Sequence, residues 1–440
     1  MKDGLRERLA ALGARLEAFQ PLELQGEVQE VVGLLIVSRG PAVAVGDAVR
    51  IVPEGGGAEV LAEVVGFRRG AVLLMPLGDL GAVGPGARVR PAGGPLSVVV
   101  GETLVGRVLD GLGRPQDGGA PIRGERRPVF RPPPPPLARP PIRAPLPVGI
   151  RAIDGLLTVG RGQRMGIFAG SGVGKSTLLG MIARGTAADV NVIALIGERS
   201  REVREFLERD LGEAGRRRSV VVAVPSDQPA LLRMKGAYVA TAIAEYFRDR
   251  GLDVLLMMDS LTRFAHAARE VGLASGEPPT TKGYPPSVFG LLPKLLERAG
   301  TSERGSITAF YTVLVDGDDL TDPIADAVRG LLDGHIVLSR ALAQRGHFPA
   351  IDVLESTSRV MRAIVPPEQL HLATRFRELA AVYRQSEDLI AIGAYRRGQN
   401  ARLDESLKRK EAMDAFLRQD VDERAAPEET LSALQAVFAD

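Results

Sequence analysis

The first part of the chain carries an apolar stripe whose members are spaced by alternating steps of four and three residues. The stripe consists of Leu5, Leu9, Leu12, Leu16 and Phe19. Because this spacing puts the side chains on one helical face, it predicts an amphipathic helix over residues 1–20 that ends before Pro21. Periodicity does not distinguish a helix packed on its own domain from one that docks a partner, so both interpretations stay open.

The next part, residues 21–92, has a shorter rhythm. Runs of Val, Leu and Ile such as 30–37 and 71–75 are separated by Gly and Pro turns, which is typical of a small β-barrel. Residues 93–146 are rich in Gly, Pro and Arg and contain the proline run 132–136. Because such a run favours an extended helix and lacks amide donors, we interpret 93–146 as a linker region, with a ligand for a proline-binding domain as the sharper alternative.

Residues 147–361 alternate apolar runs with helical segments. Three of these runs, 190–196, 219–224 and 254–258, are almost wholly apolar. Strands of this kind are buried on both faces, so the pattern predicts an α/β domain whose parallel sheet is covered by helices on both sides. In 362–440, apolar residues such as Leu372, Phe376 and Leu379 recur at helical spacing, which predicts a helical C-terminal domain.

Composition narrows the class of protein. The 440 residues are 45% hydrophobic and 25% charged, as expected of a globular protein with several domains. No run reaches the ~18 to 20 apolar residues of a membrane span, and the start of the chain lacks the apolar segment of a secretory signal, so we expect a cytoplasmic protein. The absence of cysteine excludes disulfides and a cysteine nucleophile. A net charge of +2 and 4% aromatic residues give no reason to expect a nucleic-acid partner.

A glycine-rich segment carries the candidate chemistry. It lies between the strand-like run 164–168 and a helical run, and it consists of Gly170, Ser171, Gly172, Val173, Gly174, Lys175, Ser176 and Thr177. The glycines let several amides point at one anion, and the start of a helix adds its positive dipole end. This order of strand, loop and helix predicts an ATP site in which Lys175 neutralises the β and γ phosphates and Ser176 binds Mg²⁺.

Two carboxylates complete the expected site. Asp259 follows the apolar run 254–258, where phosphate-loop proteins place a carboxylate that holds Mg²⁺. Glu198 comes just beyond the run 190–196, and ligands of open α/β sheets bind at the carboxyl ends of the strands. We therefore expect Glu198 to activate the attacking water. Without a phosphate loop, the charged residues 198–202 would instead indicate the solvated start of a helix.

Four further motifs resemble the catalytic subunits of rotary ATP synthases. They are Gly-Glu-Arg at 197–199, Asp-Ser-Leu-Thr-Arg at 259–263, Asp-Asp-Leu-Thr-Asp-Pro at 318–323, and 349–359, which begins Pro-Ala-Ile-Asp and ends Ser-Thr-Ser-Arg. Within that superfamily, the stretches 160–165, 276–279, 282–289, 311–314 and 333–340 resemble type III export ATPases. The resemblance implies a RecA-like ATPase core that uses Mg²⁺ and a ring of six identical subunits.

The resemblance also implies roles for single residues. Arg199 and Arg263 would lie near the γ-phosphate, beside the water-activating Glu198. Arg359 stands where the family has an arginine finger that reaches into the neighbouring subunit's site. Phe348 stands where an aromatic ring packs on adenine; packing within its own turn is the alternative. Ser200 departs from the glycine common in export ATPases, which bears on the geometry of the turn beside Glu198.

Partners follow from the same resemblance. The N-terminal helix resembles the segment that binds a dimeric regulator, and the C-terminal helices resemble the part that contacts the export gate, chaperones and export substrates. We therefore expect peripheral association with an export apparatus at the inner membrane. The motifs favour the flagellar branch, with a virulence-type injectisome ATPase as the alternative. More distant alternatives are a non-catalytic ring subunit, against which Glu198 argues, and an RNA-dependent translocase of the termination-factor type, against which the low aromatic content argues.

Overall fold

The computed structural model describes residues 12, 24–315 and 321–439, and the chain divides into two compact units, residues 1–96 and 97–440. The predicted N-terminal helix therefore lies outside the described residues apart from Leu12. The first half of the motif at 318–323 also lies outside them.

Within the described residues of the first unit, six strands close into a barrel in the order β1-β2-β5-β4-β3-β6. They are β1 (Gly26–Val32), β2 (Leu35–Arg39), β3 (Asp47–Val52), β4 (Val60–Arg68), β5 (Ala71–Pro76) and β6 (Arg88–Pro95). Alternate side chains point inward, and Ile36, Val49 and Ile51 are fully buried in the barrel core. The predicted β-barrel is confirmed.

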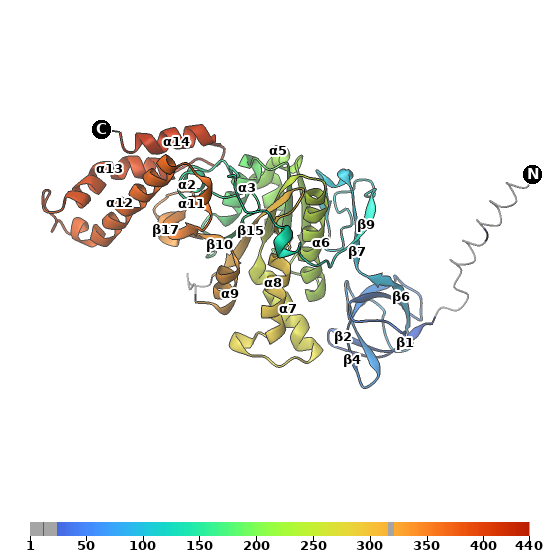
Figure 1. Ribbon diagram of the computed structural model, residues 1–440. Coiled ribbons are helices and arrows are strands. Elements are labelled where there is room, and N and C mark those ends of the chain that lie inside the picture. Colours follow the sequence, from blue (N-terminus) through green and yellow to red (C-terminus); the bar gives the residue numbers. More distant parts are fainter. Residues whose placement is uncertain (1–11, 13–23, 316–320, 440) are drawn as a thin grey trace, which may run out of the picture. The chain divides into compact units, whose positions relative to one another are not determined.

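The second unit is built on a mostly parallel sheet (Figure 1). Its main path runs through β17 (Ile351–Ser358), β16 (Gly334–Leu338), β10 (Arg164–Ala169), β15 (Ser306–Leu314), β13 (Asp253–Asp259), β11 (Val190–Ile196), β12 (Ser219–Val224) and β8 (Val108–Leu109). Only β17 on β16 and the short β14 (Gly300–Thr301) on β15 pair antiparallel among the described strands of this sheet. The predicted parallel core is confirmed, with an antiparallel strand added at one edge.

Helices cover both faces of this sheet. On one face, Ile167 of β10 and Ile193 of β11 share a core cluster with Leu178 and Ile182 of α3 (Lys175–Gly185). On the other face, α6 (Ala230–Asp249) packs on β11, β12 and β13 without joining that cluster. The remaining α-helices described in this region are α2 (Arg151–Leu156), α4 (Ser200–Glu205), α5 (Gly212–Arg216), α7 (Leu261–Ser275), α8 (Pro286–Leu296), α9 (Pro323–Leu331) and α10 (Arg340–Gln344). Successive strand residues point to opposite faces, which is why wholly apolar strands need helices on both sides.

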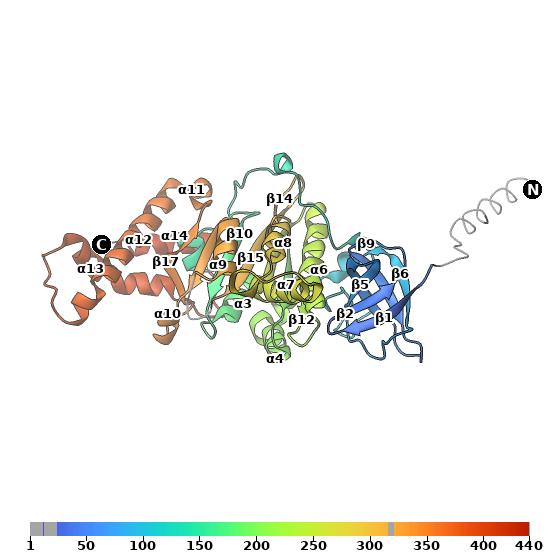
Figure 2. The same ribbon diagram turned by 90° about the horizontal axis from the view of Figure 1, so that it is seen from below.

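The C-terminal region is helical, as predicted. It consists of α11 (Met361–Ile364), α12 (Pro367–Ala391), α13 (Ala401–Leu417) and α14 (Pro427–Ala436). Phe376 of α12 and Phe416 of α13 pack with ring centroids 5.7 Å apart, and both helices contact α2. The helices lie at one end of the sheet, where α12 contacts β17 (Figure 2). No helix among the described residues combines the length and apolarity needed to cross a bilayer.

The structure differs from the expected linker over 93–146. Its strands β7 (Ser97–Val100) and β9 (Glu125–Pro128) pair with each other, and β8 joins the central sheet beside β12. Val100 and Leu109 are fully buried. The segment from Ser97 on belongs to the second unit. Its apolar residues come in short groups between Gly and Pro, so the composition hides strands that only their pairing reveals.

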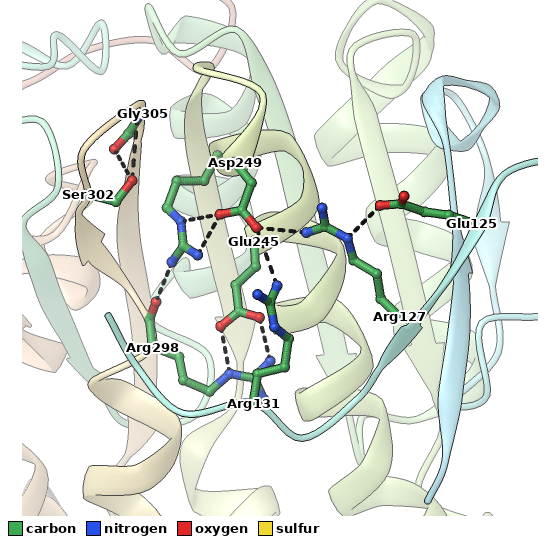
Figure 3. Close-up of polar contacts among 9 residues, drawn as sticks. Glu125, Arg127, Arg131, Glu245, Asp249, Arg298, Ser302 and Gly305 are labelled. Carbon is green, nitrogen blue, oxygen red and sulfur yellow. Dashed lines mark hydrogen bonds and ion pairs between the residues drawn. The ribbon is translucent and has the colours of Figure 1, made fainter. Parts of the chain in front are cut away.

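Charged side chains hold this segment to the core (Figure 3). Arg298 makes two 2.8 Å hydrogen bonds to the carboxylate of Glu245 on α6, and both side chains are at most 2% exposed. Arg298 also donates to the Val129 carbonyl oxygen at 2.8 Å, and Asp249 accepts from Arg127 at 2.8 Å. Residues just before the proline run are therefore fixed by a buried hydrogen bond from Arg298 to Val129 and by a partly buried ion pair between Arg127 and Asp249.

Replacing Glu245 with Ala should strongly destabilise the second unit. The change leaves the Arg298 guanidinium buried without its counter-ion, and breaking such a pair costs about 3 to 5 kcal/mol. In chemical denaturation, the variant should unfold at a lower midpoint concentration of denaturant than the wild-type protein. As a control, Glu205→Ala removes an exposed i,i+4 pair with Arg201 and should leave the midpoint unchanged. Equal midpoints for the two variants would contradict a structural role for the buried pair.

Candidate active site

The glycine-rich loop joins the carboxyl end of β10 to the start of α3. The helix begins at Lys175, and Gly174 precedes it in the left-handed conformation with φ 87°; Gly172 has φ 77°. Residues with a Cβ rarely adopt these angles, so the two glycines are what allow the chain to curl. The loop thus presents its amides at the N-terminus of an 11-residue helix, a natural seat for phosphate.

Three of the predicted side chains meet beside this loop. The Lys175 ammonium donates a hydrogen bond to Asp259 Oδ1, and its Nζ lies 3.5 Å from Glu198 Oε1. Asp259 ends β13, and Glu198 lies two residues beyond the end of β11. These strands and β10 run parallel, with β15 between β10 and β13, so their carboxyl ends share one edge of the sheet.

The charged side chains of this cluster shift one another's pKa values. Burial raises the pKa of Glu198 to about 7, and the negative charge of Asp259 adds to the shift while Lys175 opposes it. Burial disfavours the charged form of Lys175, but attraction by Asp259 and Glu198 outweighs that cost and leaves the lysine pKa above its ordinary value. The lysine therefore stays charged, while the Glu198 carboxylate changes protonation near neutral pH.

Two buried polar atoms beside Lys175 lack hydrogen-bond partners. They are Nε of Arg263 on α7 and Oε1 of Glu198, which is paired with Lys175 by charge at 3.5 Å but accepts no hydrogen bond. Gly197, with φ 72°, brings the two residues together, since a Cβ there would lie 2.9 Å from Arg263 Cβ. Buried polar atoms without a hydrogen bond are rare and costly in folded proteins. Their position fits a site that a bound nucleotide and its water complete.

The oxygen atoms at the site suit magnesium. Asp259 offers a carboxylate, and Ser176 presents an exposed hydroxyl on the first turn of α3. Magnesium in nucleotide sites is held by one or two such protein oxygens together with phosphates and water. The described residues contain no group of three or more His, Cys, Asp or Glu side chains that would hold a metal alone. The donor set therefore fits Mg²⁺ delivered with a nucleotide.

The other predicted residues lie in different surroundings. The ring of Phe348 faces the loop, since a Cβ on Gly174 would lie 3.6 Å from two of its ring carbons, and the residue is 46% exposed. The Arg199 side chain is 80% exposed and pairs with Glu202 at 3.5 Å, so the structure does not bring its guanidinium to the cluster. Arg359 is exposed and follows the end of β17.

Ser200 does not disturb the turn beside Glu198. It is the first residue of α4, and Arg69 and Lys282 are the non-glycine residues with positive φ in the described parts of the chain. A serine therefore fits here without strain, and the backbone does not require a glycine at this position.

Sequence reasoning missed Thr312. Its hydroxyl donates a 2.6 Å hydrogen bond to Asp259 Oδ1 from the neighbouring strand β15. The oxygen that receives Lys175 is thereby fixed from a second side. Nothing in the sequence marks one buried threonine among several, because the contact depends on the register that pairs Met258 with Tyr311.

The raised pKa of Glu198 predicts that the rate of ATP hydrolysis decreases at acidic pH. Only the deprotonated carboxylate can accept a proton from water, so kcat/KM should fall about tenfold per unit as pH drops below about 7. Steady-state ATPase rates between pH 5.5 and 8.5 would measure this. A profile that stays level down to pH 5.5 would contradict a titrating Glu198 in the free enzyme.

This combination of a parallel sheet, a phosphate loop and facing Lys, Glu and Asp side chains defines a P-loop ATPase with a RecA-like core. Models of the ATP synthase alpha/beta family match residues 28–93 with its beta-barrel domain and 149–358 with its nucleotide-binding domain. The T3SS EscN ATPase C-terminal domain matches 365–436. The chain belongs to the ATP synthase alpha/beta family, in the branch that holds flagellum-specific and type 3 secretion ATPases.

Individual relatives agree with this assignment. The flagellum-specific ATP synthase of Bacillus subtilis (strain 168) is 57% identical, over 96% of this chain and 97% of that protein. The type 3 secretion system ATPase of Xanthomonas euvesicatoria is 55% identical, over 94% of each chain. The structure of the assembled ATPase EscN from enteropathogenic E. coli superposes with a TM-score of 0.89 at 48% identity and covers 94% of this chain and all of that one. The predicted resemblance to type III export ATPases is confirmed.

Proposed function

We propose that this ATPase works as a homohexameric ring that hydrolyses Mg-ATP and energises protein export through a flagellar type III secretion apparatus. The observation that carries the proposal is the cluster of Lys175, Glu198 and Asp259 at the phosphate loop. Four relatives named flagellum-specific ATP synthase, at 57, 53, 53 and 50% identity, support the flagellar assignment. The 55% identical Xanthomonas protein supports an injectisome ATPase as the second candidate.

The residues of the cluster divide the work of hydrolysis. In the absence of phosphate, Lys175 neutralises Asp259 and Glu198, and a bound triphosphate offers it stronger partners. Lys175 would then pair with the β and γ phosphates, which would leave Asp259 and Ser176 to hold Mg²⁺ together with water. Bound Mg²⁺ supplies charge neutralisation on the phosphate oxygens. Glu198, no longer paired with the lysine, orients the attacking water and accepts its proton.

Two side chains are proposed to contact the nucleotide at its ends. Arg263 lies beside Glu198 with a buried Nε that has no hydrogen-bond partner, which supports a role for its positive charge at the γ-phosphate. Phe348 lies against the phosphate loop with nearly half of its surface exposed, and an open ring face there suits adenine. The Arg199 side chain points to solvent. It would contact the γ-phosphate only if the turn at 197–199 changed conformation when the nucleotide binds.

The position of Arg359 supports a ring. Its backbone N–H donates to the Asp333 carbonyl oxygen, and the Asp333 N–H donates to the carbonyl oxygen of Arg164, the first residue of β10. The phosphate loop follows the last residue of the same strand, about 17 Å away for six extended residues. An arginine side chain is much shorter than this distance. Arg359 therefore completes the site of a second copy rather than its own.

Partners are proposed from the relatives. One solved structure shows EscN in complex with its central stalk EscO, and it superposes with a TM-score of 0.87. We propose an equivalent stalk for this ring, a regulator at the N-terminal segment, and the export gate, chaperones and substrates at the C-terminal helices. These contacts would keep a cytoplasmic ring at the inner membrane.

Gene replacement tests the flagellar proposal. Cells lacking this chain should stop exporting flagellar hook and filament proteins, and the wild-type chain should restore export while Lys175→Ala should not. The culture medium and motility are the readouts. Loss of injected effector proteins with normal flagella would instead establish the injectisome function.

A further inference from the structure

Gln163 is a fully buried amide that the proposed mechanism does not use. It lies just before β10, at the edge of the sheet opposite the phosphate loop. Its Nε2 group donates to the Asp333 carbonyl oxygen and to Ser358 Oγ, both at 3.1 Å. Ser358 directly precedes Arg359, and the Arg359 N–H donates to the same Asp333 carbonyl at 3.0 Å.

The direction of these hydrogen bonds is fixed by their partners. Oε1 of Gln163 faces the Gly160 N–H at 2.8 Å, which can only donate, so the amide group cannot be turned around. The Ser358 hydroxyl gives its one hydrogen to the Thr158 carbonyl oxygen at 2.8 Å and so must accept from Gln163. The Gln163 amide nitrogen, which also lies 3.1 Å from Met165 Sδ, therefore holds the residues that flank the Arg359 backbone.

A second set of hydrogen bonds fixes Asp333. The Asp333 carboxylate takes three 3.0 Å hydrogen bonds from Arg164, one from its backbone and two from its guanidinium. The Asp333 carbonyl is thereby anchored to the first residue of β10. An arginine that acts in the neighbouring subunit's site does not contact the nucleotide of its own subunit. Hydrogen bonds within its own subunit must therefore fix its position.

From this geometry we infer that Gln163 is a positioning residue for Arg359, holding the finger's backbone so that its guanidinium enters the neighbouring site correctly. The inference rests on the proposed function, in which Arg359 acts in trans. Small displacements of such a group are expensive, since a shift of about 1 Å can cost 10²-fold in rate. Loss of the Gln163 amide should thus lower kcat and leave KM for ATP nearly unchanged.

Mixed rings give a test that separates positioning from folding. In a mixture of Lys175→Ala and Arg359→Ala chains, some sites combine the finger of the first chain with the phosphate loop of the second, so activity recovers. Gln163→Met added to the Lys175→Ala chain, which supplies the finger, should lower the recovered kcat about tenfold or more. The same change on the Arg359→Ala chain, which supplies only the loop, should alter it less than about twofold.

Each other outcome overturns the inference. Equal losses in both placements would mean that Gln163 acts on the fold, and no loss in either would mean that it does not set the finger. If the parent mixture forms rings but recovers nothing, the trans finger of the proposed function fails as well.

A second variant pair covers the case in which Gln163→Met does not fold. Ser358→Ala removes the hydroxyl that accepts from Gln163, whereas Ser358→Thr keeps it. On the finger-supplying chain, Ser358→Ala should lower kcat and Ser358→Thr should retain it. The same rate for both variants would overturn the inference.

Discussion

Replacing Glu198 with Gln should lower kcat for ATP hydrolysis by about 10² to 10⁴-fold, the usual share of a general base. The amide keeps the size of the side chain but cannot accept the proton of the attacking water. Nucleotide binding should persist or tighten, because a negative charge 3.5 Å from Lys175 is removed beside the phosphates. Steady-state turnover and equilibrium binding of a fluorescent ATP analogue would measure the two effects separately.

The matched control for this change is Glu208→Gln. Glu208 is an exposed partner of Arg204 in the helical segment that follows Glu198, and its replacement should leave turnover unchanged. The Glu198 variant should also unfold at a slightly higher temperature, since burial and Asp259 make the native carboxylate unfavourable at neutral pH. Undiminished turnover of Glu198→Gln would remove Glu198 from the mechanism and shift attention to a water held by other groups.

Arg359→Ala should reduce kcat by about 10³-fold or more, with little change in nucleotide affinity. An arginine finger stabilises charge that develops only in the transition state, and losing one costs 10³ to 10⁵ in related phosphoryl-transfer reactions. Arg359→Lys should recover only part of the rate, because an ammonium lacks the planar fork of the guanidinium. Arg362→Ala, an exposed neighbour in α11, serves as the control and should retain full activity.

The same reasoning predicts a concentration dependence for the wild-type enzyme. Because Arg359 is about 17 Å along β10 from its own loop, the proposed trans finger would leave a monomer with an incomplete site. Activity per mole of chain should rise as dilute protein assembles, in step with particle size from light scattering. Constant specific activity across the monomer-to-ring transition would show that Arg359 is not needed in trans.

Local chemistry explains why so much of the active site could be predicted. The loop 170–177, Asp259 and Glu198 are each contiguous with a strand whose apolar run marks it as buried. Parallel strands bring their carboxyl ends to one edge, so a strand assignment already places the residues that follow it. The helical C-terminal region and the barrel could be predicted for the same reason, since their periodicities reflect which face is buried.

The pairing of strands that are distant in the sequence could not be predicted from local sequence patterns. The segment 93–146 resembled a linker because Gly and Pro dominate it, yet β8 finds a place beside β12, and Arg298 and Glu245 fix the residues before the proline run. The direction of the Arg199 side chain likewise depends on how α4 leaves the sheet, and its local sequence motif carries no sign that it faces solvent.

The sequence by itself determined the ATPase chemistry of this protein, because a phosphate loop and its carboxylates are local patterns with a fixed relation to strand ends. Only the tertiary structure decided the partners of those groups. The register of β13 against β15 puts Thr312 on Asp259, and the antiparallel pairing of β17 carries Arg359 to the far edge of the sheet. Register and strand order are set by the packing of the whole core, which no short stretch of sequence contains.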